Sequence, residues 1–147
     1  MTRKVDNPIV SLVSRLVSPF IMIYALYVIF HGHYSPGGGF QGGTMLAAAV
    51  LLLRISAGSE ISQLQFKKSW GTRMGSMGVL IYFGTGFLCL LLGGNFLDYH
   101  YLAKILPVSD VMARSWGILF VEIGVGIAVM GLLVAIYDDL LEGNPNA

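Results

Sequence analysis

One acidic residue, Glu122, stands inside a long apolar stretch of this 147-residue chain. An ionised carboxylate in hydrocarbon costs roughly 2.5 kcal/mol or more, so we expect its side chain to face protein or water rather than lipid. Removal from water favours the uncharged form of a carboxyl, which suits a group that takes up and releases protons. Glu122 is therefore a candidate residue of an ion path. The structural alternative is a carboxyl paired with a basic side chain or a hydroxyl of a neighbouring helix.

Two histidines, His31 and His33, flank Gly32 at the end of the first apolar stretch. Histidine titrates near neutral pH, so a pair beside a membrane face is a second candidate for an ion path. The interpretation favoured here is simpler, with both rings hydrogen-bonded to carbonyls of the loop. We expect no metal site, because no cysteine or further carboxylate lies nearby in the sequence.

The histidines open a glycine-rich segment, His31–Thr44, with the sequence HGHYSPGGGFQGGT. Its glycines let the backbone turn sharply and pack closely, and Pro36 fixes one φ angle. We interpret the segment as a tightly specified loop between two membrane helices, at or just inside one face of the membrane. Gln41 and Thr44, at the start of the second helix, are interpreted as capping residues rather than ion ligands.

The same segment contains the G-x-G-x-x-G pattern of dinucleotide-binding proteins, at residues 37–42. That fingerprint requires a preceding strand and a βαβ unit, whereas here an apolar stretch of helical length precedes it. We therefore expect no nucleotide and no other cofactor. No Ser/His/Asp, Cys/His or paired-carboxylate arrangement stands out, so the chain does not look like a self-contained enzyme.

The elements that must position these residues are membrane helices. Hydrophobic residues make up 55% of the chain and charged residues 12%, whereas soluble domains carry about 25% charged residues. A compact soluble protein of this size could not cover its surface with so few charges. The formal net charge of +1 gives no indication of nucleic-acid binding, and the single cysteine, Cys89, excludes an internal disulfide. The sequence thus predicts one all-α domain, residues 1–147, integral to a membrane.

Four stretches are long and apolar enough to cross a bilayer, at about residues 9–30, 41–57, 74–94 and 115–137. The first spans roughly 33 Å at 1.5 Å per residue, against a hydrocarbon core of about 30 Å. Asn7 is predicted as its N-cap and Pro8 as its first helical residue. Residues 61–66 are a weak candidate for a short interfacial helix.

The distribution of Lys and Arg predicts the orientation of the chain. Two of these residues, Lys104 and Arg114, lie between the third and fourth helices, and none lies in the first loop. Seven lie toward the N-terminus or around the connection between the second and third helices: Arg3, Lys4, Arg15, Arg54, Lys67, Lys68 and Arg73. Both termini are therefore predicted on the cytoplasmic side, with the glycine-rich loop outside. After the last helix, Asp138, Asp139 and Glu142 are interpreted as an acidic tail.

Glycines recur every seven residues in the last helix, at Gly117, Gly124 and Gly131, and form a seam for close helix packing. Glu122 lies about 160° around the helix from Gly124, so two opposite faces need cover from protein or water. In a four-helix monomer one of these faces would meet lipid. We infer from this that the chain sits inside a larger membrane assembly.

The glycine-rich segment, which follows an apolar helix and opens an alanine-rich one, resembles the signature of the MnhB/MrpB-type subunit of the Mrp multisubunit cation/proton antiporters. The length, the four predicted helices and the cytoplasmic termini resemble that family too, so the likeness covers nearly the whole chain. The residues that carry it are His31, His33, Pro36, Gly37, Gly38, Gly39, Phe40, Gln41 and Gly42.

The resemblance implies an accessory subunit, without a catalytic site of its own, of a hetero-oligomeric antiporter that exchanges Na⁺ for H⁺ across the cell membrane. Its partners would be the other membrane subunits and the lipid bilayer, and loop residues 36–42 would serve assembly. Related subunits occur in membrane-bound hydrogenase and sulfane-sulfur reductase complexes, and that setting stays open. So do a purely structural spacer and, with less support, a stand-alone homo-oligomeric transporter.

Overall fold

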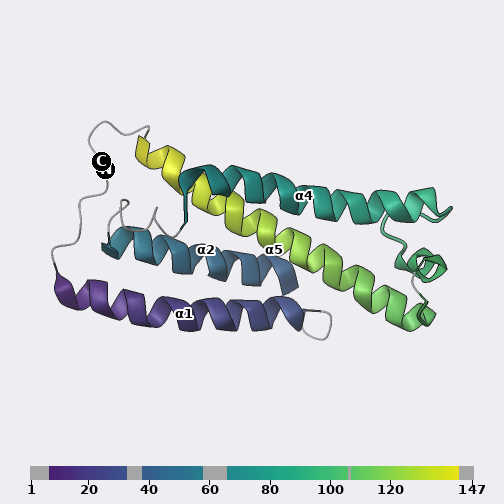
Figure 1. Cartoon of the computed structure of the whole chain (residues 1–147), viewed down its shortest axis with the longest axis horizontal. Coiled ribbons are helices and arrows are strands. Elements are labelled where there is room, and N and C mark those ends of the chain that lie inside the picture. Colours follow the sequence, from purple (N-terminus) through teal and green to yellow (C-terminus); the bar gives the residue numbers. More distant parts are fainter. Residues whose placement is uncertain (1–6, 33–37, 58–65, 106, 143–147) are drawn as a thin grey trace.

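The computed structural model describes residues 7–32, 38–57, 66–105 and 107–142. These residues form four long helices and one short 3-10 helix between the last two (Figure 1). The elements are α1 (Pro8–Phe30), α2 (Gly38–Ala57), α4 (Lys68–Leu91), η1 (Tyr99–Lys104) and α5 (Asp110–Glu142). All four long helices are apolar enough to cross a membrane. The prediction of an all-α membrane fold with four spans is therefore confirmed, while the orientation of the termini stays a prediction.

The start of α1 is built as the sequence predicts. Asn7 accepts a hydrogen bond at its Oδ1 from the backbone N–H of Ile9 at 3.0 Å, and Pro8 occupies the first helical position. The side chain satisfies an N–H group that has no partner within the helix, and proline has no N–H to satisfy there.

The other helices begin earlier than predicted. α2 begins at Gly38, α4 at Lys68 and α5 at Asp110, and α5 continues past Tyr137 to Glu142. Charged residues end an apolar pattern without ending the helix, because the backbone hydrogen bonds continue unchanged beyond the hydrocarbon. Most of the candidate interfacial helix, residues 61–65, lies outside the described ranges.

α5 is the central helix of the fold, with α4 packed along one side and α2 and α1 along the other. Figure 1 shows it crossing diagonally between α4 and the α1–α2 pair. At the α4 interface the backbones meet closely. A Cβ added at Gly71 would lie 3.0 Å from the carbonyl oxygen of Gly131, and one at Gly124 would lie 3.0 Å from the carbonyl oxygen of Gly78. Small residues thus bring the two helices together, as dispersion-driven packing in lipid requires.

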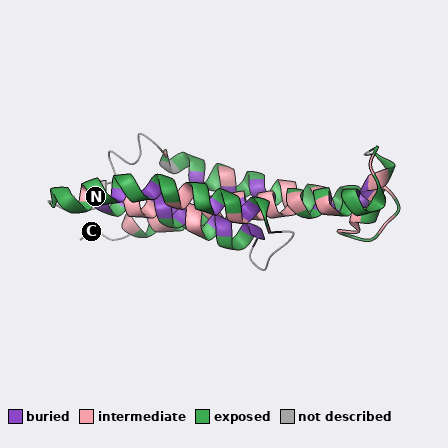
Figure 2. Ribbon diagram, turned by 90° about the horizontal axis from the view of Figure 1, so that it is seen from below, coloured by how far each residue is buried: buried purple, intermediate pink, exposed green. Residues whose placement is uncertain are grey.

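Alanine is the commonest of the buried apolar residues, and many large apolar side chains point outward. Ala25, Ala47 and Ala49 are at most 1% exposed, whereas Leu12 and Phe20 are each 67% exposed. Figure 2 shows exposed positions along the outer surfaces of the helices. Exposed apolar surface of this extent is the surface expected against lipid or another protein, which supports the membrane assignment.

A cluster of buried residues packs η1 against the long helices. Cys89 of α4, Leu102 of η1 and Ala113 of α5 are buried together. Nearby, the ring of Tyr99 lies against α5 at Gly117, where an added Cβ would come within 2.5 Å of the ring. The connection between α4 and α5 is therefore packed onto the helices.

Candidate functional site

Glu122 lies on α5 at the level where α1 ends and α2 begins. A Cβ added at Gly38 would lie 2.5 Å from Oε1 of Glu122 and 2.9 Å from its carboxyl carbon, and one at Gly32 would overlap the carboxylate. A Cβ at Gly39 would overlap the backbone carbonyl of Glu122. The carboxylate thus lies against Gly32 and Gly38, and Gly39 lies against the backbone of the same residue. The space that these three glycines leave for Glu122 is called here the glycine pocket.

Gly38 meets two separate requirements for glycine. Its φ of +52° lies in the left-handed region, which costs an L residue with a side chain roughly 1–2 kcal/mol. It also leaves the space that the Glu122 carboxylate fills. As the first residue of α2, Gly38 brings the positive end of the helix dipole beside this carboxylate, a position that favours an anion.

The prediction that the second helix begins at about residue 41 is wrong by three residues, because α2 begins at Gly38 and residues 38–40 of the glycine-rich segment are helical rather than loop. Gly42 faces α1, where an added Cβ would lie 3.0 Å from Cδ1 of Ile29. Gly43 faces α5, where an added Cβ would lie 2.6 Å from the carbonyl oxygen of Gly126. Close packing on two sides outweighs the low helix propensity of glycine here.

The capping interpretation of Gln41 and Thr44 is also wrong, because α2 has already begun before either residue. The Thr44 hydroxyl donates to the carbonyl oxygen of Phe40 at 2.8 Å, one turn back within the helix. Phe40 and Gln41 are exposed on the outer side of α2. Of the other residues of the predicted loop, His33, Pro36 and Gly37 lie outside the described residues.

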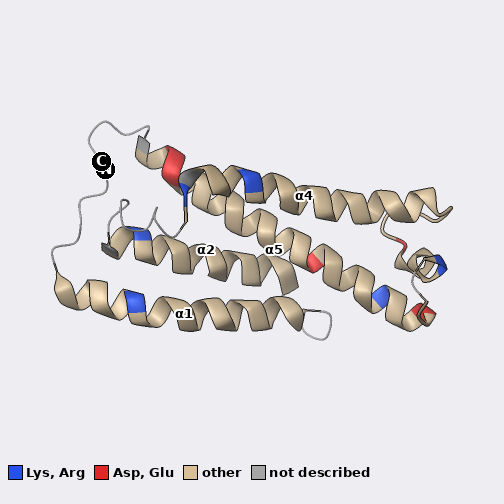
Figure 3. Ribbon diagram, in the orientation of Figure 1, with Lys and Arg blue, Asp and Glu red and all other residues tan. Residues whose placement is uncertain are grey.

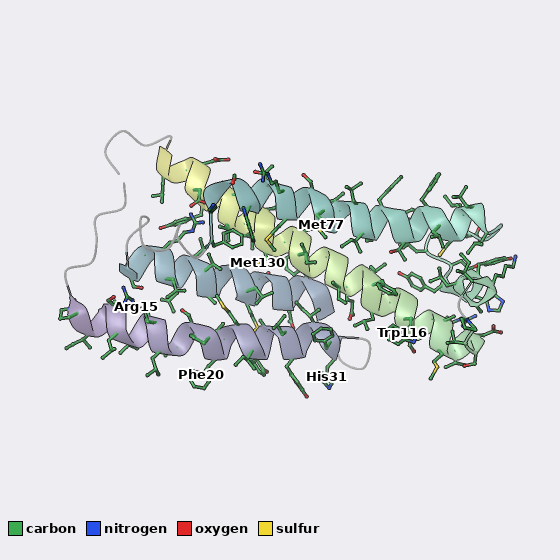
Figure 4. The ribbon with its side chains drawn as sticks, in the orientation of Figure 1. Arg15, Phe20, His31, Met77, Trp116 and Met130 are labelled. Carbon is green, nitrogen blue, oxygen red and sulfur yellow. The ribbon has the colours of Figure 1, made fainter. Side chains whose placement is uncertain are left out.

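His31 lies at the end of α1 (Figure 4). Its ring Nδ1 is 3.0 Å from the carbonyl oxygen of Tyr27, and the two rings stack with centroids 4.1 Å apart. The favoured sequence interpretation, a carbonyl-bonded histidine, fits this geometry, although the carbonyl belongs to α1 rather than to the loop. A role of His31 in an ion path stays a prediction.

Both faces of α5 that need protein cover find it within this chain. Gly124 and Gly131 pack against α4, and Gly117 packs against Tyr99 of η1. On the opposite face Glu122 meets the glycine pocket. The physical argument from these two faces to a larger assembly is therefore wrong, because Gly124, Gly131 and Glu122 all contact other helices of this chain. An assembly needs support from elsewhere.

A buried ion pair joins α2 to α5 at the other end of the bundle. Nη1 of Arg54 donates to Oδ1 of Asp138, and Nη2 donates to the carbonyl oxygen of Phe66 at 3.0 Å. The two side chains are 1% and 5% exposed. The interpretation of Asp138 as part of an acidic tail is therefore wrong. Figure 3 shows charged positions of α2 and α5 at this end.

Sequence analysis missed this ion pair, although a signal for it is present. Arg54 and Asp138 each close an apolar stretch, and the predicted topology puts those two ends on the same membrane face. Opposite charges at one level of a helix bundle are candidates for pairing, because an unpaired buried charge is costly.

Tyr99 is a titratable group of η1 within electrostatic range of Glu122. Burial raises the pKa of its phenol, and the charges of Cys89, Tyr82 and Glu122 raise it further. Since an unperturbed tyrosine has a pKa of about 10, the phenol is neutral at physiological pH. Tyr99 thus adds a protonated hydroxyl, and no charge, to the surroundings of Glu122.

An apolar hollow of about 470 Å³ lies among α4, η1 and α5, and Leu80, Leu88 and Phe120 are among its lining residues. Its one hydroxyl, on Thr85, donates to the carbonyl oxygen of Ile81 at 2.7 Å. The hollow therefore offers little to an ion. Within the described part of the chain, no three His, Cys, Asp or Glu side chains are grouped as metal ligands.

Comparison with known proteins gives matches over nearly the whole chain. Residues 9–135 match the family described as "Domain related to MnhB subunit of Na+/H+ antiporter". A Na⁺/H⁺ antiporter subunit of Alkalihalophilus pseudofirmus is 29% identical over 140 residues, which cover 95% of each chain. The putative antiporter subunit mnhB2 of Staphylococcus aureus is 28% identical over 95% of this chain and 98% of its own. An uncharacterised protein of Methanocaldococcus jannaschii is 30% identical over 89% of this chain and 51% of its own.

Proposed function

The chain belongs to the MnhB family, and we propose that it acts as an accessory subunit of a multisubunit Na⁺/H⁺ antiporter in which Glu122 takes part in ion exchange. Support for a place in an antiporter complex comes from relatives that are named as antiporter subunits and that this chain matches over most of their length. The four helices able to span a membrane support it as well. The chain is thus a multi-pass membrane protein that works with other membrane subunits.

The observation that carries the role of Glu122 is its place in the glycine pocket, on the central helix and beside the amino end of α2. The helix dipole favours the ionised carboxylate, while removal from water favours the protonated form. A group that exchanges protons has to adopt both forms, and these surroundings offer support to each of them. The ionised form also supplies the negative charge that a passing Na⁺ needs.

The test is Glu122→Gln in the complete complex, with Na⁺-driven proton movement measured in everted membrane vesicles. Glutamine keeps the shape of the side chain and removes its charge. We expect antiport to fall at least about tenfold, which corresponds to about 1.4 kcal/mol, while the other subunits still co-purify. Asp139→Asn is the matched control, because Asp139 is an exposed acid of the same helix. Full antiport by an assembled Glu122→Gln complex would exclude the proposed role.

A structural role is the second candidate, and the exposure of Phe40 favours it. This side chain is 65% exposed at the start of α2, beside the residues that form the glycine pocket. If the segment serves as a docking surface, Phe40→Ala should release the chain from the complex on native gels. Phe83→Ala is the control, since Phe83 of α4 is 55% exposed. A structural role alone would leave the antiport activity of Glu122→Gln intact.

A further inference from the structure

The charges of α5 indicate where the membrane faces lie. Between Arg114 and Asp138 this helix carries one charged residue, Glu122. The interval of 24 residues spans about 36 Å, slightly more than the hydrocarbon core of about 30 Å. Arg114 and Asp138 therefore lie near opposite faces. At the Asp138 face, α2 reaches the same level, because its Arg54 pairs with Asp138.

At the Arg114 face, α1 and α2 stop short. Gly32 and Gly38, where α1 gives way to α2, lie level with Glu122. Arg114 is eight residues before Glu122 in the sequence, or about 12 Å along the helix axis. Figure 1 shows α4 and α5 continuing beyond the ends of α1 and α2, and Figure 4 places Trp116 on this part of α5. The described ends of α1 and α2, at Gly32 and Gly38, therefore lie about 12 Å short of the Arg114 face along the axis of α5.

A strip of α5 between Glu122 and the Arg114 face lies on the same side of the helix that α1 and α2 cover from Glu122 toward Asp138. At about 100° per residue, Val111, Ser115 and Ile118 lie within about 40° of the direction of Glu122. Val111 is 77% exposed and Ile118 is 36% exposed. Arg114, also exposed, borders the strip. The interface of α5 with α1 and α2 thus ends at Glu122, but the face of α5 that forms it continues to Val111.

We propose that this strip binds a transmembrane helix of a neighbouring subunit that presents an acidic side chain to Arg114, an inference that rests on the proposed role as an accessory subunit. Lipid is a poor occupant, because the backbone leaves the helical conformation at His31, and non-helical backbone at membrane depth needs cover from protein or water. The exposed guanidinium of Arg114 favours a carboxylate partner. Ser115 is small, and its hydroxyl is already bonded to the carbonyl oxygen of Val111 at 3.2 Å, so a helix can approach closely.

The test uses the complete complex in native membranes. A photo-cross-linking amino acid at position 118, in an otherwise unchanged chain, should form a covalent adduct with a membrane subunit of the same complex, identified by mass spectrometry. Ser115→Trp should lower co-purification of that subunit at least about tenfold, or about 1.4 kcal/mol. Ser76→Trp is the control, because Ser76 of α4 is exposed and, like Ser115, donates one turn back, to the carbonyl oxygen of Thr72 at 3.0 Å.

Charge variants test the acidic partner. Arg114→Glu should lower co-purification by a similar factor, and Arg114→Lys should retain it, because only the first brings like charges together. Cross-links from position 118 confined to lipid, or their absence, would overturn the proposal, as would a Ser115→Trp complex that assembles normally. Both readouts report binding rather than transport. A Glu122→Gln complex with normal antiport would therefore refute the proposed ion exchange and leave the docking result standing.

Discussion

The two carboxylates that α5 carries inside the bundle are held in different ways. Asp138 pairs with the guanidinium of Arg54, which is also bonded to the carbonyl of Phe66. Glu122 lies in the glycine pocket, against backbone at the start of α2. A guanidinium is always protonated and fixes its partner as a carboxylate, whereas a helix end supplies only about half a charge. The difference suits Asp138 to holding helices together and supports the proposed role of Glu122 in ion exchange.

The largest effect should come from breaking the ion pair. Arg54→Ala leaves the carboxylate of Asp138 buried without its guanidinium, which typically costs about 3–5 kcal/mol. We expect a large drop in the unfolding temperature of the purified chain in detergent. Arg15→Ala, at an exposed arginine of α1, should change the stability by less than about 0.5 kcal/mol.

An apolar double variant, Arg54→Met with Asp138→Leu, should regain most of the lost stability, because replacing a buried pair by apolar residues is often neutral. If Arg54→Ala and the unchanged chain melted at the same temperature, the ion pair would not stabilise the fold. Asp138 would then not differ from Glu122 in holding helices together.

A smaller loss is expected at the glycine pocket. In Gly38→Ala the alanine must adopt a left-handed φ, which lowers the stability by roughly 1–2 kcal/mol. Its Cβ also collides with the carboxylate of Glu122. Combining it with Glu122→Ala should relieve the collision but not the backbone strain, so the double-mutant cycle should give a coupling of about 1 kcal/mol. Gly84→Ala is the control, because nothing lies within 4 Å of a Cβ there, and it should be neutral or stabilising. If the losses of stability in Gly38→Ala and Glu122→Ala were additive, the carboxylate of Glu122 would not require a glycine at position 38.

The smallest effect concerns a neutral contact between α1 and α2. The buried hydroxyl of Ser18 donates to the carbonyl oxygen of Ala49 at 3.3 Å. Hydrogen bonds between membrane helices average about 0.6 kcal/mol, so Ser18→Ala should lower the unfolding free energy by about that amount. Chemical denaturation of the purified chain, with Ser76→Ala as an exposed control, measures the difference. If Ser18→Ala lowered the unfolding free energy as much as Arg54→Ala does, the large effect at the ion pair could not be attributed to its charges.

The four spans could be predicted from the sequence because apolar length alone determines what can cross a bilayer. The start of α1 could be predicted as well, since Asn7 and Pro8 act locally. The ends of α4 and α5 could not, because Lys68 and Asp138 interrupt the hydropathy without interrupting the helix. Hydropathy indicates where a helix leaves the hydrocarbon core of the membrane, but it does not indicate where the helix itself ends.

The sequence identified Glu122 as a candidate site residue, but it did not identify the residues that surround it. Glu122 stood out because an acid within an apolar stretch needs an explanation, and the angular separation from Gly124 placed it on the correct face. Its neighbours depend on how α1 and α2 pack, which no local pattern gives. The ion pair joins residues 84 positions apart, and the helical start of α2 at Gly38 reflects contacts with α1 and α5 rather than glycine's own preference.

Cys89 is fully buried, packed against Leu102 and Ala113, and it is the chain's only cysteine. Its thiol can meet a water-borne alkylating reagent only when η1 separates from the long helices. The rate of labelling therefore measures how often this end of the protein opens, without any engineered probe.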